Sequence, residues 1–180
     1  MNPSLRRLAR SGGLVAAAFA LKYPLVAIPG LEPLTLVFFA LGYAYGPIWG
    51  ALVGATGEVV YATLNPLGVA VVPVWMAQII GMAGAGVAGG ATRFLADHLA
   101  HRDGRLPAIL AGVLATLFFD AVTNLAYALS IGPFWPVLLA GLPFAAVHVA
   151  SNALLFLTIF PTLRRWLMRP AHAVVEPSAT

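Results

Sequence analysis

Long apolar stretches separated by short breaks cover most of the chain. The breaks IPGLEP, YGP, NPLG and SIGPFWP contain proline, which removes a backbone donor, and glycine, which permits turn dihedrals, so each marks the end of a helix. The only long polar break is TRFLADHLAHRDGRLP. This pattern predicts six apolar helical segments, at about 12–28, 33–45, 47–64, 69–91, 107–130 and 135–161.

The composition places these segments in a lipid bilayer. Of the 180 residues, 61% are hydrophobic and 9% are charged, whereas soluble domains carry about 25% charged residues. A spanning helix needs about 20 residues, so the chain has room for five or six spans, although the segment 33–45 is short and could be re-entrant. We predict one all-α integral membrane domain over residues 1–165 and a polar, disordered cytoplasmic tail over residues 166–180.

The arginine positions decide the number of spans. They form three clusters at the ends of apolar segments: Arg6, Arg7 and Arg10; Arg93, Arg102 and Arg105; and Arg164, Arg165 and Arg169. With six spans all three clusters lie on one side, as the positive-inside rule requires, whereas five spans would split them. The sequence therefore predicts a bundle of six transmembrane helices with both termini cytoplasmic. The net charge of +4 reflects this orientation and does not indicate a nucleic-acid partner.

The N-terminal sequence MNPSLRRLARSGGLVAAAFALKYPLVAI has the basic start and apolar run of a signal peptide. The apolar run is long, however, and it passes into PGLEPL instead of an obvious cleavage site with small residues. We therefore favour an uncleaved first span.

Polar and aromatic side chains in the apolar segments concentrate in the outer half of the predicted bundle. A charge at the centre of a spanning helix costs about 2.5–3.5 kcal/mol, so such residues usually face an interior cavity and have a function. The inner half is nearly bare, with only His148, Ser151 and Asn152. The pattern predicts a cavity that opens to the outside and is closed below. Its candidate binding residues are Lys22, Glu32, Glu58, Trp75, Gln78, Asp120, Asn124 and Tyr127.

The stretch LFFDAVTNLAY, residues 117–127, contributes most to this prediction. Thr116, Asp120, Thr123, Asn124 and Tyr127 fall on one face of a helix, which predicts a polar wall of the cavity.

Structural interpretations of the same residues stay open. Glu58 or Asp120 could form an ion pair with Lys22. Trp75, Tyr127 and Trp135 could be aromatic residues of the membrane interface. His148 and Asn152, one turn apart, could form an interhelical hydrogen-bond pair.

Small residues recur every four positions in three of the segments. Such spacing lets another helix approach closely within a membrane. We predict packing inside the bundle for the sets at Gly46, Gly50 and Gly54 and at Gly81, Ala85 and Gly89. On the first segment the set is Gly12, Ala16 and Ala20, and here an external partner is an equal alternative.

Nothing in the sequence favours an enzyme. It contains no HExxH, GxSxG or P-loop motif and no cysteine. Asp120, His148 and Ser151 could be imagined as a triad, but their positions on helices do not define that geometry. We therefore predict no catalytic residues, no metal site and no cofactor.

Two stretches are similar to a known family. AAAFA, residues 16–20, and GPIWGALVGATGE, residues 46–58, together with six short spans and cytoplasmic termini, resemble the substrate-binding S components of energy-coupling factor (ECF) vitamin transporters. The similarity covers roughly residues 10–165.

The resemblance implies a multi-pass protein of a bacterial or archaeal cytoplasmic membrane that captures a small water-soluble vitamin or precursor from outside. The loop IPGLEP would close over the ligand, and the face with Ala16 and Ala20 would dock on a transmembrane coupling subunit driven by two cytoplasmic ATPases. ATP hydrolysis would belong to those partners. The family's ligand contacts do not carry over, so the candidate binding residues rest on their depth alone.

The acidic and aromatic candidates indicate a ligand that is aromatic or heterocyclic, with hydrogen-bond donors or positive charge. Thiamine-like compounds, pyrimidines, a queuosine precursor and cobalamin-related compounds all meet this description. The main alternative is a non-transport scaffold of cell-envelope machinery, in which neutralising Asp120 or Glu58 would leave function intact. A membrane enzyme or a stand-alone carrier is the remaining possibility.

Overall fold

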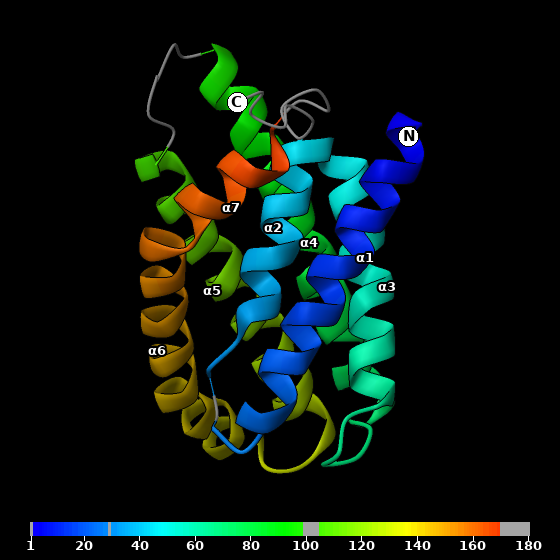
Figure 1. Ribbon diagram of the computed structural model, residues 1–180. Helices are drawn as coiled ribbons and strands as arrows, with labels where there is room; N and C mark the ends of the chain where they lie inside the picture. Colours follow the sequence, from blue (N-terminus) through cyan, green and yellow to red (C-terminus); the bar gives the residue numbers. More distant parts are fainter. Residues whose placement is uncertain (1, 29, 99–104, 170–180) are drawn as a thin grey trace, which may run out of the picture.

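A computed structural model describes residues 2–28, 30–98 and 105–169, and every regular element in these ranges is helical (Figure 1). The all-helical prediction is therefore confirmed. The elements in chain order are α1 (Pro3–Lys22), the short 3-10 helix η1 (Tyr23–Leu25), α2 (Pro33–Tyr45), α3 (Pro47–Thr63), α4 (Val72–His98), α5 (Arg105–Ser130), α6 (Phe134–Thr158) and α7 (Phe160–Leu167).

Three helices are long and apolar enough to cross a membrane. These are α4, α5 and α6, with 27, 26 and 25 residues, or about 40 Å at 1.5 Å per residue, against a hydrocarbon core of about 30 Å. Large apolar side chains on them, such as Leu114, Leu129 and Leu139, are more than half exposed. Apolar surface of this kind needs a lipid or protein environment. The chain is a membrane protein.

Prolines mark where several helices begin. Pro3, Pro33, Pro47 and Pro161 stand in the first turns of α1, α2, α3 and α7, where the missing N–H has no intrahelical partner to lose. Pro161 also explains why the last predicted span is divided. The final turns form the separate helix α7, which includes Trp166 and Leu167 of the predicted tail. The rest of that tail, from residue 170, lies outside the described residues.

Other boundaries also differ from the prediction, and α1 ends at Lys22 instead of near residue 28. Helix α1 begins at Pro3 instead of near residue 12, with the side chain of Asn2 capping it at Ser4 N. Helix α4 continues to His98, beyond the predicted end at 91. Its last turns are polar and carry the pair Arg93–Asp97 at 2.7 Å, a spacing that stabilises helices.

Helix α2 is the centre of the bundle. Every residue from Leu34 to Tyr43 is buried, and α2 packs against α1 and against each of α3 to α7. It has 13 residues, about 20 Å, so it is much shorter than the outer helices. At its C-terminal end the guanidinium groups of Arg93 and Arg164 each lie 5.7 Å from the ring of Tyr43. Its N-terminal end consequently falls short of the opposite end of the bundle.

Glycines allow α2, α3 and α4 to touch along their backbones. A Cβ atom on Gly42 or Gly50 would overlap the backbone of Gly86, and one on Gly86 would overlap the backbone of Gly50. Gly54, Gly81 and Gly89 are also in close contact with neighbouring helices, which confirms the predicted packing inside the bundle. Gly46 differs from its set, because it has a φ of +99° at the junction of α2 and α3 and makes no such contact.

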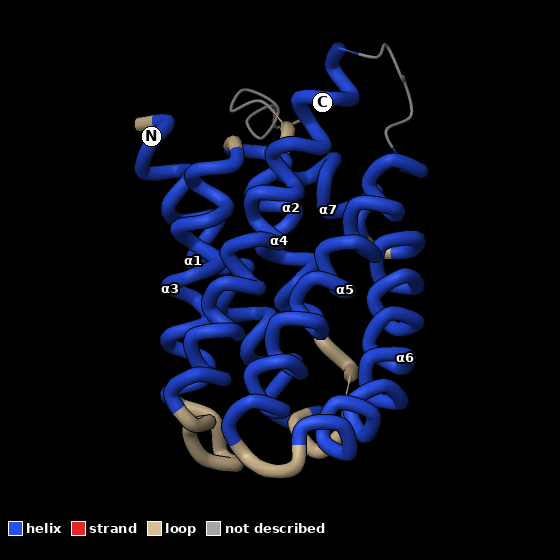
Figure 2. Tube along the Cα trace, turned by 180° about the vertical axis from the view of Figure 1, so that it is seen from behind, coloured by secondary structure: helices blue, strands red, loops and turns tan. Residues whose placement is uncertain are grey.

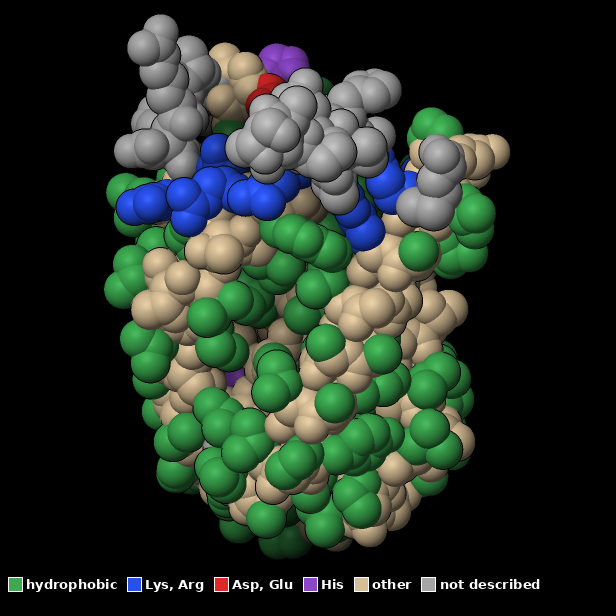
Figure 3. Space-filling model, viewed as in Figure 1, with side chains coloured by type: hydrophobic (Ala, Val, Ile, Leu, Met, Phe, Trp, Pro, Cys, Tyr) green, Lys and Arg blue, Asp and Glu red, His purple; other side chains and the backbone are tan. Residues whose placement is uncertain are grey.

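The two ends of the bundle differ in charge. Helix α1 begins and α7 ends at one end, and the α3–α4 and α5–α6 connections lie at the other (Figures 1 and 2). Arginine side chains gather at the first end, above a largely apolar surface (Figure 3). Several are held by the protein: Arg7 stacks on Trp49 at 4.0 Å, and Arg10 donates a hydrogen bond of 2.9 Å to the carbonyl of Leu167. We call this the arginine end.

The glycine contacts predict the effect of one added methyl group. Gly86→Ala should destabilise the bundle by about 1–3 kcal/mol, because the new Cβ can be accommodated only if α3 and α4 move apart. Thermal unfolding of the purified protein in detergent measures this. Gly13→Ala on α1 is the matched control, since a Cβ there meets nothing within 4 Å. Equal melting temperatures for the two variants would contradict the close-packing argument.

Candidate functional site

A cavity of about 250 Å³ lies at the end of the bundle opposite the arginines, beside the N-terminus of α2. Five of the eight predicted binding residues line it, and they come from α1, α3, α4, α5 and the segment before α2. These five are Lys22, Glu32, Glu58, Gln78 and Asp120. The remaining lining residues are Val26, Gly30, Tyr61, Asn65, Leu67, Phe119, Phe144 and His148.

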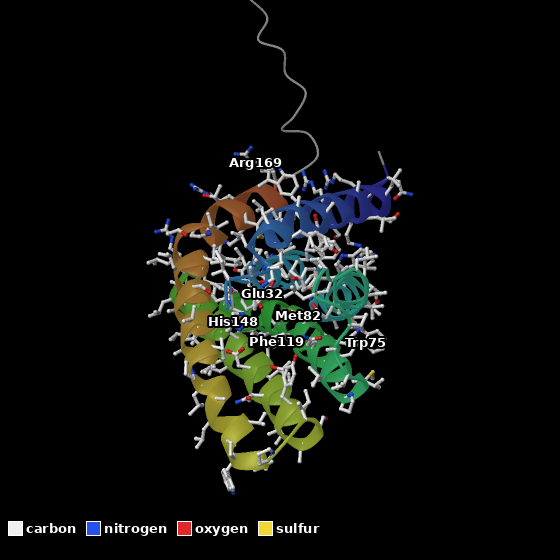
Figure 4. All side chains as sticks on the ribbon, turned by 90° about the horizontal axis from the view of Figure 1, so that it is seen from below. Glu32, Trp75, Met82, Phe119, His148 and Arg169 are labelled. Carbon is white, nitrogen blue, oxygen red and sulfur yellow. The ribbon has the colours of Figure 1, made fainter. Side chains whose placement is uncertain are left out.

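The other three predicted residues lie elsewhere. The structure places Trp75 at the edge of the bundle, whereas Glu32, Phe119 and His148 lie close together between the helices (Figure 4). The amide of Asn124 donates a hydrogen bond of 2.8 Å to the carbonyl of Leu138, so it joins α5 to α6. Tyr127 is 39% exposed on the surface of α5.

The polar face predicted for residues 116–127 therefore does not act as one wall. Only Asp120 lines the cavity. The hydroxyls of Thr116 and Thr123 donate hydrogen bonds to carbonyls one turn earlier in the same helix, those of Gly112 at 2.9 Å and Phe119 at 2.8 Å. Threonine hydroxyls satisfied in this way need no cavity.

Lys22 and Glu32 form an ion pair at the cavity wall, with 3.1 Å between Nζ and Oε2 and side chains about nine-tenths buried. Lys22 also donates a hydrogen bond of 2.9 Å to the carbonyl of Leu31. The other oxygen of Glu32 accepts a hydrogen bond of 2.8 Å from Leu34 N and caps α2. Lys22 is therefore committed to Glu32, and the alternative pairing with Glu58 or Asp120 is not formed.

Asp120 and His148 connect α5 to α6 inside the cavity. The distance from His148 Nδ1 to Asp120 Oδ1 is 2.7 Å, and the two side chains are 5% and 15% exposed. The ring of Phe119 meets the imidazole edge-on at 5.7 Å. Because an ionised carboxylate only accepts hydrogen bonds, the geometry assigns the donor to Nδ1.

Sequence reasoning did not select His148 for the binding site. It placed His148 in the inner half of the bundle and considered it in a pair with Asn152 or in a triad with Asp120 and Ser151. In the structure both side-chain polar atoms of Asn152 lack a partner among the described residues. The positions of Asp120 and His148 along the hairpin formed by α5 and α6 could have indicated that the two side chains meet. Asp120 lies about three turns before the end of α5, and His148 lies about four turns after the start of α6, so the two side chains have similar depth.

Several polar atoms on the cavity wall are buried without a hydrogen-bond partner in the part of the chain that the structure describes. They are Glu58 Oε2, Gln78 Oε1, Asp120 Oδ2 and His148 Nε2. A buried polar group without a partner costs about 1–3 kcal/mol, and more when it is charged. Other such atoms, on Tyr23, Tyr45 and Trp75 for example, are scattered outside the cavity. Four of these atoms thus belong to residues of one cavity, an arrangement that can pair with a polar molecule.

Aromatic rings complete the wall. Tyr61 lies beside Tyr23, with ring centroids 5.6 Å apart, and beside Phe19 at 5.7 Å, so its position is fixed by packing. Phe119 and Phe144 line other parts of the cavity. Apolar walls with a few converging polar groups are typical of small-molecule sites.

The segment between α1 and α2 is fastened to α6 next to the cavity. Gly30 lines the cavity, and its carbonyl accepts a hydrogen bond of 2.5 Å from Ser151 Oγ. Gly30 has a φ of +76°, and a Cβ there would overlap the backbone nitrogen of His148. Both the positive φ and the close approach require glycine at this position.

Among residues 2–28, 30–98 and 105–169, no group of three or more histidine, aspartate or glutamate side chains could hold a metal ion. No protein-family model matches the sequence, and neither the curated proteins nor the solved structures contain a match. The cavity is therefore the main basis for a functional argument.

The Lys22–Glu32 pair predicts a non-additive response to mutation. Lys22→Met should destabilise the protein by about 3–5 kcal/mol, because it leaves the carboxylate of Glu32 buried without its partner. Adding Glu32→Gln should recover part of that loss, since the amide removes the charge and its oxygen can still cap α2. Thermal unfolding of both single variants and the double variant forms the required cycle. Losses that simply add would show that the pair contributes nothing.

Proposed function

We propose that the protein is the substrate-binding S component of an ECF-type importer and captures a small water-soluble vitamin or precursor. The observation that carries this proposal is the cavity, whose lining residues include carboxyl, amide and imidazole groups with buried atoms that have no partner within the described ranges, inside an otherwise apolar chain. Intramembrane ionisable residues are costly and are usually retained for a substrate or ion pathway.

The arrangement of the helices supports six spans and an outward-facing cavity. Helices α1 to α6 alternate in direction, so the arginine end collects the start of α1, the end of α6 and α7 (Figure 1). Arginine-rich ends of membrane proteins face the cytoplasm. The arginine end is then cytoplasmic in a bacterial or archaeal membrane, and the cavity at the opposite end receives its ligand from outside.

The exposed face of α1 supports docking to a coupling subunit. Gly12, Ala16 and Ala20 are all exposed, and a Cβ on Gly12 would meet nothing within 4 Å. A face of small residues lets another membrane helix approach closely. The partner would be a transmembrane coupling protein driven by two cytoplasmic ATPases, which accords with the absence of a P-loop from this sequence.

The size of the cavity favours the smaller ligands of this class. Its volume of about 250 Å³ lies near the lower end of ligand pockets, about 300–1,000 Å³. Thiamine-like compounds, pyrimidines and a queuosine precursor have one or two small ring systems. The macrocycle of a cobalamin-related compound is much larger than the cavity, so this candidate is the least favoured.

Small molecules carried by the purified protein test the proposal. We expect mass spectrometry to detect a vitamin or precursor released from the wild-type protein and absent from the Glu58→Ala/Asp120→Ala variant, which removes two of the unpartnered acceptors. Thr56→Ala, on the exposed face of α3, is the matched control and should retain the molecule. A wild-type protein that carries nothing and binds no water-soluble vitamin would refute the proposal and favour a scaffold.

Docking through α1 predicts a separation of binding from transport. Ala16→Leu should leave stability and ligand binding unchanged, because the position is exposed. It should abolish uptake into cells and the co-purification of ATPase subunits with the tagged chain. Leu21→Ala, at a largely exposed position near the other end of α1, serves as the control. Normal uptake by Ala16→Leu would exclude this face as the docking surface.

A further inference from the structure

The polar groups of the residues that line the cavity restrict the chemistry of its ligand. The inference drawn from them rests on the proposed function. Four residues that line the cavity have a buried polar atom without a partner in the described ranges, and three of these atoms, Glu58 Oε2, Gln78 Oε1 and Asp120 Oδ2, are oxygens of carboxyl or amide groups. Such oxygens accept hydrogen bonds, unless a carboxyl group is protonated. A ligand that pairs with all three oxygens as acceptors therefore supplies donors toward α3, α4 and α5.

The cavity has no cationic group left for an anionic ligand. Lys22 is the single lysine of the sequence, and its ammonium group is already engaged by Glu32 Oε2 and the carbonyl of Leu31. None of the described arginines lines the cavity. The charge of Lys22 is thus balanced by Glu32, while Glu58 and Asp120 add two further carboxylates to the wall.

His148 extends the acceptor character of the site. Its Nδ1 donates to Asp120, which in a neutral imidazole leaves Nε2 as an acceptor. When both carboxyl groups are ionised, all four of these atoms accept hydrogen bonds. A protonated imidazole would balance Asp120, and the carboxylate of Glu58 would still have no cationic partner.

The aromatic part of the wall is suited to the same kind of ligand. Tyr61, Phe119 and Phe144 line the cavity together with the carboxylates. Cations bind over the faces of aromatic rings, and the attraction grows when water is excluded. Glu58 and His148, which lie among these rings, are 2% and 4% exposed.

We propose that the ligand is a small organic cation with at least three N–H or O–H donors, such as a heteroaromatic ring that bears an aminomethyl group or a quaternary ring nitrogen. Its donors would pair with Glu58, Gln78 and Asp120, and its positive charge would stabilise the ionised form of the two carboxyl groups, which lack a lysine or arginine partner among the described residues. An anion would instead bring its acceptor oxygens against carboxylate oxygens, which is repulsive.

Ligand pairs that share a ring and differ in charge test this proposal. The probes are pyridoxamine with pyridoxine, and the aminomethyl with the cyano derivative of deazaguanine, together with thiamine, biotin and nicotinate. Binding to purified protein is measured by thermal shift and by competition with the molecule that co-purifies. We expect the native molecule to be a cation and only cationic probes to bind. A neutral or anionic native ligand, or tighter binding of the neutral member of a pair, would overturn the proposal of a cationic ligand. It would not contradict the proposed import function.

Charge-neutralising variants provide the second readout. Glu58→Gln and Asp120→Asn keep the shape and one acceptor oxygen, and each should weaken binding of the cation about 10- to 100-fold, the effect of losing a charged hydrogen-bond partner. Asp97→Asn makes the same change at the arginine end, on an exposed carboxylate paired with Arg93, and should bind normally. Using two variants covers the case in which one fails to fold, as judged by size exclusion. Unchanged affinity in a folded variant would refute the proposal that the ligand is a cation. If neither the probes nor any native molecule binds, the proposed function itself is refuted.

Discussion

The central constraint in this protein is the backbone contact that holds α2 between α3 and α4. Gly42, Gly50 and Gly86 leave no room for a side chain where the three helices meet. Within a membrane, where apolar side chains gain little by leaving lipid, such close contact is a main source of helix association. It fixes α2 against the arginine end, and because α2 has only 13 residues, the opposite end of the bundle lacks a central helix. The cavity occupies that space, with Glu32 at the tip of α2 as part of its wall.

The cavity retains polar groups at a cost that the rest of the bundle avoids. Thr116 and Thr123 satisfy their hydroxyls within their own helix, and Asn124 is satisfied by a carbonyl of α6. Glu58, by contrast, is 2% exposed and has an oxygen without a partner in the described ranges. Replacing such a group by an apolar residue would be expected to stabilise the fold. Its presence is better explained by binding than by stability, which is the usual relation at functional sites.

Sequence reasoning predicted the apolar helices and the polarity of the two ends, because hydropathy, proline positions and arginine clusters depend on local sequence. It also placed Lys22, Glu32, Glu58, Gln78 and Asp120 in one region from depth alone, and the structure brings these side chains to one cavity. Depth does not fix rotation about the helix axis, however. Trp75 and Tyr127 have suitable depth but do not line the cavity, and His148 was assigned to a structural pair although it contacts Asp120. The ion-pair partner of each charged side chain depends on tertiary contacts, which no local sequence pattern encodes.

Charged side chains are arranged differently at the two ends of the bundle. The contacts at the arginine end hold helices together, whereas the groups at the cavity end include carboxyl oxygens available for binding. At the arginine end, cations lie on aromatic rings or donate to carbonyls, as Arg7 does on Trp49 and Arg10 to Leu167. These contacts tie α1 to α3 and α7 and leave charge at the surface, where water and lipid headgroups solvate it. At the cavity end the one cation is paired internally, and carboxylates are the groups left over. The cavity end thus pairs its own lysine and leaves carboxyl oxygens without a partner in the described ranges, which is the feature that supports the proposed binding of a donor-rich molecule.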